Sequence, residues 1–147
     1  MDGRSLKPEQ VAVTCNVDDR GFLYQIYGNY ESKFPSVKRI YVVGNFSRGT
    51  IRGFHKHREE WKGYFVSNGS AKFVIVDENK NMLTYILSSK NPTILIVPPE
   101  YFHGWVSLEE NTILIGISNK NLEESLKDDV RIDPFTFGKE LWDVKAR

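Results

Sequence analysis

Cysteine and histidine are scarce in this sequence, and each shortage limits what the chain can be. Cys15 is the only cysteine among 147 residues, so no disulfide can form within the chain, and there are only three histidines. The first residues, 1–8, lack the apolar core of a signal peptide. No apolar run approaches the roughly 20 residues of a membrane span. We therefore expect a cytoplasmic protein with no membrane partner.

An excess of charge of either sign is also missing. Twenty Lys and Arg residues against 19 Asp and Glu residues give a net charge of +1, so nothing favours a nucleic-acid partner. The hydrophobic fraction of 40% and the charged fraction of 27% are ordinary for a globular protein. We expect a single domain over residues 1–147, with 1–10 as a loose lead-in and 119–147 as a C-terminal extension.

Short β-rich runs are present throughout, and they recur about every 8 to 12 residues with turn residues between them. Asn68-Gly69 predicts a β-hairpin, and residues 122–126 predict a short helix. The pattern predicts an all-β sandwich or barrel with a short C-terminal helical segment. The expected strands are 11–16, 22–27, 37–43, 51–57, 62–67, 72–76, 82–87, 93–97, 104–107 and 112–118.

The three histidines lie in two of these runs. His55 and His57 share one expected strand, and side chains two apart on a strand point to the same face. His103 lies in the segment 98–105, and Lys62 follows His57 closely. This spacing predicts that the imidazoles line one small-molecule pocket. The alternative is that the histidines are hydrogen-bonded strand residues and that Lys62 is solvated.

The spacing of Gly49, His55 and His57 resembles the first motif of the cupins, and 98–103 resembles the second except for one glycine. This resemblance implies a cupin fold, a jelly-roll β-barrel. The motif's metal-binding Glu falls on Lys62, whose ammonium would oppose a divalent cation. We therefore expect no metal and no other cofactor; a metal-dependent cupin with a three-histidine site is the alternative.

Without a metal, these groups suit proton transfer. Histidine has a reference pKa near 6.5, which suits removal of a proton at neutral pH. Lys62 and Arg52 supply positive charge that stabilises an enolate oxygen or binds phosphate. A base that faces a cation across a pocket is what proton abstraction next to a ketone requires.

Several segments resemble the metal-free cupin family of dTDP-4-dehydrorhamnose 3,5-epimerase. The segment 52–55, Arg-Gly-Phe-His, is similar to the family's Arg-Gly-Leu-His. The segment 19–22, Asp-Arg-Gly-Phe, is similar to an element whose arginine contacts the nucleotide diphosphate. Asn45-Phe-Ser is similar to the family's Asn-His-Ser, and 99–105 to its Pro-Glu-Gly-Phe-Ala-His-Gly-Phe. Together the resemblance covers residues 17–138.

This resemblance implies a nucleotide-sugar substrate, a dTDP-linked 4-keto-6-deoxyhexose of deoxysugar and polysaccharide biosynthesis. It also implies a homodimer that forms by exchange of N-terminal strands. His55 would be the base and Lys62 would hold the enolate, with His57 and His103 in support. The implied substrate-binding residues are Arg20, Arg52 and Asn45. We add Tyr41 and Trp105 as candidates, with packing as the alternative role for Trp105.

Two of the family's functional groups are absent where the resemblance places them. The catalytic tyrosine falls on Gly116. The late Lys-Asp pair, whose carboxylate pairs with the base, lies beyond the end of this chain. The acid is therefore left open between Tyr41, Tyr64, Tyr101 and water, and the partner of His55 is unassigned.

A second branch, the sugar 3,4-ketoisomerases, is similar in other segments. The interval from His55 to Gly69 and the segment 36–41, Ser-Val-Lys-Arg-Ile-Tyr, resemble that branch, although it usually has Gln at position 62. We predict an epimerase that acts at C3, or at C3 and C5. A 3,4-ketoisomerase and a catalytically inactive sugar-nucleotide-binding cupin are the alternatives.

Overall fold

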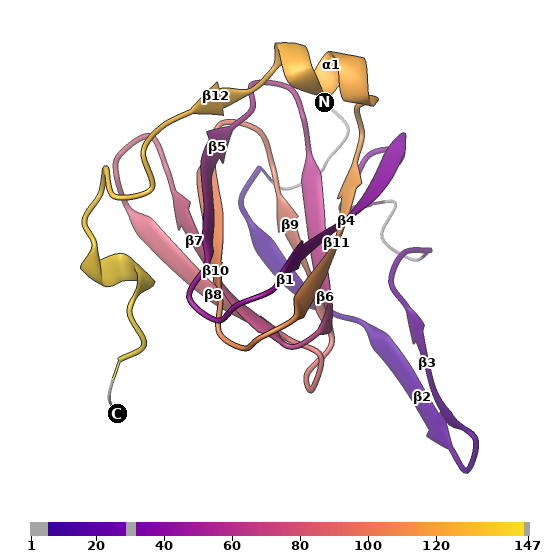
Figure 1. The fold of residues 1–147 in the computed structure, drawn as a ribbon. Helices are drawn as coiled ribbons and strands as arrows, with labels where there is room; N and C mark the ends of the chain where they lie inside the picture. The colour runs from indigo at the N-terminus through magenta and orange to yellow at the C-terminus, as the bar shows by residue number, and fades with distance from the viewer. Residues whose placement is uncertain (1–5, 29–31, 146–147) are drawn as a thin grey trace.

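Two antiparallel sheets face each other and form a jelly-roll barrel (Figure 1). The computed structural model describes residues 6–28 and 32–145, and in these ranges the sheets run β1-β9-β6-β11-β4 and β12-β5-β10-β7-β8, with a separate β2-β3 hairpin. This architecture confirms the predicted all-β cupin fold. The elements are β1 Glu9–Ala12, β2 Thr14–Asp18, β3 Gly21–Gln25, β4 Arg39–Asn45, β5 Ile51–Lys56, β6 Lys62–Asn68, β7 Ser70–Val76, β8 Met82–Ser88, β9 Thr93–Val97, β10 Phe102–Ser107, β11 Thr112–Ser118, α1 Leu122–Lys127, β12 Val130–Arg131 and the 3-10 helix η1 Glu140–Trp142.

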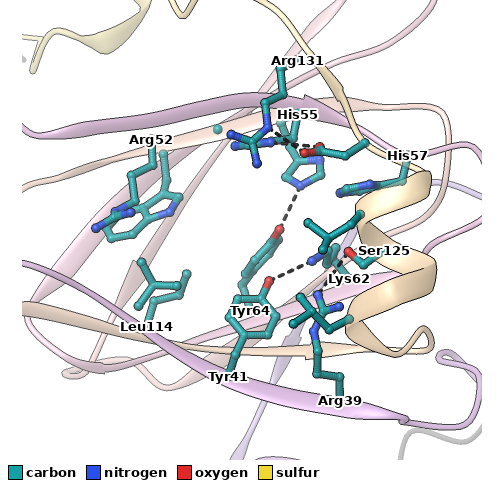
Figure 2. Close-up of a pocket in the computed structure, with 17 residues that line it drawn as sticks. Arg39, Tyr41, Arg52, His55, His57, Lys62, Tyr64, Leu114, Ser125 and Arg131 are labelled. Atoms are coloured by element: carbon teal, nitrogen blue, oxygen red, sulfur yellow. Dashed lines mark hydrogen bonds and ion pairs between the residues drawn. The ribbon is translucent and has the colours of Figure 1, made fainter.

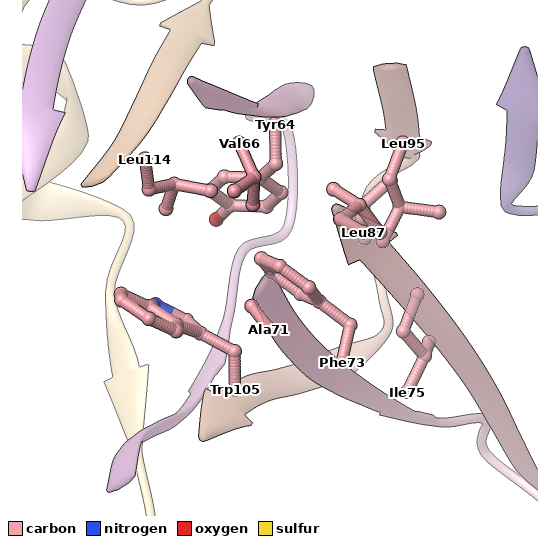
Figure 3. Close-up of a cluster of buried hydrophobic side chains, with 10 residues drawn as sticks. Tyr64, Val66, Ala71, Phe73, Ile75, Leu87, Leu95, Trp105 and Leu114 are labelled. Carbon is pink, nitrogen blue, oxygen red and sulfur yellow. The ribbon is translucent and has the colours of Figure 1, made fainter. Parts of the chain in front are cut away.

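The hydrophobic core fills the space between the two sheets (Figure 3). Alternate residues of the facing strands point inward, because successive side chains of a strand lie on opposite faces. Phe73 is fully buried, and its ring stacks on Trp105 with 6.1 Å between centroids. Tyr64, Trp105 and Leu114 belong both to this core and to the wall of a cavity above it. The core therefore forms the floor of the site.

The predicted hairpin at Asn68-Gly69 is wrong. β6 pairs with β9 and β11, whereas β7 pairs with β8 and β10, so the two strands belong to different sheets. Gly69 has a φ of +80°, and a Cβ there would lie 2.5 Å from Oγ1 of Thr112. A glycine fits this tight corner, at which the chain crosses from one sheet to the other. The same turn residues that predict a hairpin also serve such a crossing.

The N-terminal boundaries also differ from the prediction. β1 begins at Glu9, inside the stretch expected to be loose, because its backbone pairs with β9 and the Gln10 side chain donates to Ile86 O and Thr93 Oγ1. Residues 1–5 of the expected lead-in lie outside the described residues. The run predicted at 11–16 is divided at Val13 between β1 and β2.

The β2-β3 hairpin projects from the barrel (Figure 1). Asp19 and Arg20 form its tip, between the paired residues Asp18 and Gly21. Its apolar residues are largely uncovered, with Val17 76% and Phe22 70% exposed. An arm with uncovered apolar side chains is typical of a surface that another chain covers.

The C-terminal segment crosses the open end of the barrel (Figure 1). Helix α1 is preceded by its N-cap Asn121, whose side chain accepts from Glu124 N in a capping box. β12 then pairs with β5 and places Arg131 opposite His55. The predicted helix is confirmed, whereas β12 was not predicted. Among the described residues, no helix is long and apolar enough to cross a membrane.

Candidate active site

A cavity of about 360 Å³ opens between the two sheets, beneath α1 (Figure 2). One wall carries His55 from β5, His57 just after that strand, and His103 from β10. The opposite wall carries Tyr41 from β4 and groups from β6. The size suits a small-molecule ligand.

Seven of the nine predicted site residues line this cavity, namely His55, His57, Lys62, His103, Arg52, Trp105 and Tyr41. Asn45 lies behind the wall, where its Oδ1 accepts from Arg52 Nε at 2.7 Å. Arg20 is 86% exposed at the tip of the hairpin, where it pairs with Asp18. The structure therefore does not bring Arg20 to the cavity of its own chain.

The partner of His55 is Asp129, which corrects the expectation that this carboxylate lies beyond the chain. Nδ1 of His55 lies 3.1 Å from Oδ1 of Asp129, and Nε of Arg131 donates to Oδ2 at 2.6 Å. Burial raises the pKa of Asp129, but the bonds from Arg131 and His55 outweigh it and hold that pKa below the usual value. An ionised carboxylate accepts only, so Nδ1 carries the proton and Nε2 is the basic nitrogen.

The pKa of His55 itself is lowered by burial, and Asp129 opposes this effect. His55 therefore stays neutral near pH 7 and can take a proton, while Asp129 stabilises the imidazolium that results. Asp129 was missed because only the long-range pairing of β12 with β5 brings it here. The available signal was the pair of adjacent carboxylates, Asp128 and Asp129, just after the predicted helix.

Tyr41 occupies the space that Gly116 leaves open. The two residues stand opposite each other in β4 and β11. A Cβ on Gly116 would lie 2.6 Å from Cε2 of Tyr41, so only glycine leaves room for this ring. The Tyr41 hydroxyl accepts a hydrogen bond from Lys62 Nζ at 3.1 Å. A tyrosine is thus present where the family's acid was expected, but it comes from the neighbouring strand.

His57 and His103 differ in which nitrogen remains available. Nδ1 of His57 donates to Asp128 O at 2.6 Å, and Nδ1 of His103 donates to Tyr101 O at 3.2 Å. Nε2 of His103 also accepts from the Tyr64 hydroxyl at 2.8 Å, whereas the described residues provide no hydrogen bond to Nε2 of His57. Nε2 of His57 is therefore available to hydrogen-bond a ligand, whereas both ring nitrogens of His103 are engaged.

The His103–Tyr64 pair is electrically neutral. Burial, and next the charge of His57, lowers the pKa of His103 well below its usual value. Burial raises the pKa of Tyr64 well above its usual value, with the nearby Tyr41 as a further cause. The pair is a buried, hydrogen-bonded part of the wall, which favours a structural role for His103 over the predicted catalytic one. In the described part of the chain, no three His, Cys, Asp or Glu are arranged to hold a metal ion.

Cationic groups surround the rest of the cavity. Arg52 is held by Asn45 and by Gly44 O, and Arg39 and Arg131, which were not predicted, also line the space. Guanidinium groups bind phosphate oxygens through paired donors. Two arginines that the sequence patterns did not single out therefore add to the expected anion-binding lining.

The fold and site together define a class of protein. A β-barrel cavity with a histidine–carboxylate pair on one wall and a tyrosine–ammonium pair on the other has the groups that proton transfer on a small carbonyl compound requires. The cationic lining indicates that this compound carries phosphate. Such proton transfers isomerise a ketosugar without any redox change.

The chain belongs to the dTDP-4-dehydrorhamnose 3,5-epimerase family, whose model matches residues 9–140. A dTDP-4-dehydrorhamnose 3,5-epimerase from Bacillus anthracis, solved with TDP and PPi bound, is 27% identical with a TM-score of 0.80, over 95% of this chain and 86% of that one.

Two curated relatives are also similar. The spore coat polysaccharide biosynthesis protein SpsL of Bacillus subtilis is 26% identical over 67% of this chain and 68% of its own length. The TDP-4-oxo-6-deoxy-alpha-D-glucose-3,4-oxoisomerase of Aneurinibacillus thermoaerophilus is 24% identical over 74% and 76%. The family and two of these similar proteins are named for dTDP-sugar epimerases and a 3,4-oxoisomerase, so the chain is an isomerase of this group.

We expect Gly116→Ala to destabilise the protein by about 1–3 kcal/mol, because the new methyl group overlaps the Tyr41 ring. Gly44→Ala is the matched control on the paired strand, since its Cβ would meet nothing nearer than Thr112 O at 3.8 Å. Urea denaturation measures both. Equal stability of the two variants would contradict the placement of Tyr41 over Gly116.

We also expect stability to fall as the pH drops from 7 to 5. Below about 6.5 the unfolded chain protonates His103, whereas the folded chain does not, because burial lowers the folded-state pKa. The stability that each such neutral histidine contributes is therefore fully present above the histidine pKa of the unfolded chain. As the pH falls below that value, the free energy of unfolding decreases by up to about 1.4 kcal/mol per pH unit for each such histidine. His55 acts in the same direction.

A His103→Gln variant should show a shallower loss of stability over this pH range, measured by urea denaturation at pH 7, 6 and 5. Most carboxylates titrate below this pH range, so the histidines cause most of the change in stability within it. A variant with the full wild-type slope would show that His103 is not the buried neutral group.

Proposed function

We propose that this protein is an epimerase that inverts C3 of a dTDP-linked 4-keto-6-deoxyhexose. Nε2 of His55 removes the C3 proton, and the electron pair of that bond moves to the C4 oxygen. Lys62 donates a hydrogen bond to the resulting enolate. The Tyr41 hydroxyl then returns a proton to the opposite face of C3. Afterwards His55 loses its proton and Tyr41 regains one through solvent, so the reaction is redox-neutral.

The observation that carries this proposal is the position of base and acid on opposite walls. His55 belongs to β5 in one sheet, and Tyr41 belongs to β4 in the other (Figure 2). A planar enolate between them is open to His55 on one face and to Tyr41 on the other. Removal from one face and return to the other is what inversion requires.

Two observations support the proposal that the substrate carries a nucleotide diphosphate. The cavity is lined by Arg39, Arg52 and Arg131, and guanidinium forks suit a diphosphate. The similar Bacillus anthracis epimerase was solved with TDP and PPi. We propose that the arginines hold the diphosphate while Trp105, on the cavity floor, contacts the sugar.

A specific observation also favours 3,4-ketoisomerisation as a second candidate. Nε2 of His57 is available on the same wall as His55. After His55 removes the C3 proton, Nε2 of His57 can carry the proton of the C3 hydroxyl to the C4 oxygen, and the His55 imidazolium can return its proton to C4 of the enediol, which moves the carbonyl to C3. The relative from Aneurinibacillus thermoaerophilus is named for this reaction.

Incubation with dTDP-4-keto-6-deoxyglucose in D₂O, followed by NMR, distinguishes these reactions. We expect deuterium at C3 with inversion there. Deuterium at C3 and C5 would extend the activity to both centres, and a carbonyl found at C3 would establish the ketoisomerase instead. No exchange at any position would contradict both candidates.

The base can be tested with His55→Asn, which should lower the exchange rate about 10²–10⁴-fold because no other group replaces a positioned general base. Lys56→Gln is the control on the same strand, since its side chain pairs with Glu100 outside the cavity. Full exchange in His55→Asn would overturn the assignment of the base.

We propose a homodimer in which the hairpin of each chain covers its partner and brings Arg20 to the partner's diphosphate site. The uncovered apolar residues of the hairpin and the exposed, outward position of Arg20 support this arrangement. The exposed Ile40 and Val42 of the edge strand β4 offer a surface for the contact.

Mixed dimers test this arrangement. Arg20→Ala and His55→Asn chains should each be inactive, and mixing should restore about one quarter of wild-type activity, because half of the dimers then contain one complete site. If Arg20 acts within its own chain, no mixed dimer has a complete site and no activity returns. Sedimentation equilibrium should show the mass of two chains.

We propose the cytoplasm as the compartment. Cys15 is a free, exposed thiol, which reducing compartments preserve. Cell fractionation should recover the protein with cytoplasmic enzymes, and its recovery outside the cell or with membranes would contradict this proposal.

A further inference from the structure

Glu60 is a fully buried carboxylate that the proposed reaction does not use. It lies between His57 and β6, and its backbone N–H donates to Asp128 Oδ2 at 3.0 Å. Its side chain has no exposed surface. Carboxylates are almost never fully buried unless they are paired, so its partners indicate what it does.

Three donors converge on one oxygen of this carboxylate. Oε2 of Glu60 lies 3.0 Å from Lys62 Nζ, 3.3 Å from Arg39 Nη2 and 2.6 Å from Ser118 Oγ. Burial raises the pKa of Glu60, but the charge of Lys62 and these bonds outweigh it and hold the pKa below its usual value. Glu60 is therefore ionised between two cations.

The other oxygen faces the histidine wall. Oε1 of Glu60 is buried and has no hydrogen-bond donor among the described residues, and it lies 3.6 Å from Nδ1 of His57. A buried acceptor without a donor is uncommon in folded proteins. The carboxylate is thus placed between the ammonium group of Lys62 and the imidazole of His57, although it does not line the cavity.

We infer that Glu60 is a positioning residue, which holds the Lys62 ammonium against the Tyr41 hydroxyl and aims its remaining donor at the substrate. The inference rests on the proposed function. An ammonium has three N–H donors. One reaches Glu60 and one reaches Tyr41, which leaves the third for an enolate oxygen in the cavity.

Charge balance points the same way. Lys62 and Arg39 both reach Oε2 of Glu60, so without the carboxylate these two cations would lie close together and repel each other. With it, the cluster keeps one net positive charge near the place where the enolate forms. Glu60 therefore keeps Lys62 both charged and fixed in direction, which is what a preorganised donor needs.

Crystal structures of Glu60→Gln and Glu59→Gln test the positioning without reference to any reaction. Glu59 is the matched control, because it is the adjacent residue and its side chain is 78% exposed. We expect Lys62 Nζ to keep its 3.1 Å contact with the Tyr41 hydroxyl in Glu59→Gln and to leave it in Glu60→Gln. An undisturbed contact in Glu60→Gln would overturn the inference.

Kinetics of C3 exchange test the consequence. Glu60→Gln should lower kcat at least tenfold with KM within about twofold, because the carboxylate acts on the transition state through Lys62. In a Lys62→Met background, Glu60→Gln should lower kcat by less than a further twofold, because the ammonium group that Glu60 positions is absent. Equal losses in both backgrounds would show that Glu60 acts elsewhere.

Glu60→Asp serves if Glu60→Gln does not fold. It keeps the charge but withdraws it by one methylene, so kcat should lie between those of wild type and Lys62→Met. A value equal to wild type would contradict the positioning role. If the wild-type protein exchanges no proton, the proposed function is wrong. The Lys62–Tyr41 contact in the crystal structures would still show whether Glu60 positions Lys62.

Discussion

The hydrogen bond between His55 and Asp129 is the constraint on which the rest of the site depends. It fixes the proton on Nδ1 and leaves Nε2 as the basic nitrogen, which is the atom that we propose as the base. Asp129 reaches His55 only because α1 crosses the mouth of the barrel and β12 then pairs with β5. The C-terminal segment therefore helps to form the cavity, and the capping box at Asn121, just before α1, helps to hold the residue that we propose as the base in place.

The opposite wall depends on an absent side chain. Gly116 has no Cβ, so the Tyr41 ring lies over β11 and its hydroxyl meets Lys62. Glu60 then fixes Lys62 from behind. One small residue and one buried carboxylate thus place the proposed acid, Tyr41, and the proposed enolate-binding cation, Lys62, across the cavity from His55. The barrel core, with Trp105 as its upper surface, keeps the two walls apart.

Much of this arrangement could be predicted from local sequence, and the remainder could not for identifiable reasons. The strands follow from two-residue alternation, and the shared wall of His55 and His57 follows from the same period. By contrast, whether Asn68-Gly69 closes a hairpin depends on which sheet each of the two flanking strands joins, and the local sequence does not specify this. The positions of Asp129 and Tyr41 depend on strand register: Arg131 pairs with His55, and Gly116 pairs with Tyr41. No local sequence pattern encodes this register. Arg20 lies outside its own cavity because the hairpin projects from the barrel.

The fate of the C3 proton in a Tyr41→Phe variant tests most directly whether base and acid act from opposite walls. With His55 and Asp129 intact and the acid removed, a proton can leave C3 and return only from the same face. We predict that Tyr41→Phe still exchanges C3 with deuterium at a rate within about tenfold of wild type, while inversion at C3 falls at least a hundredfold. Loss of exchange and inversion to the same extent, or inversion at the wild-type rate, would contradict the two-wall mechanism.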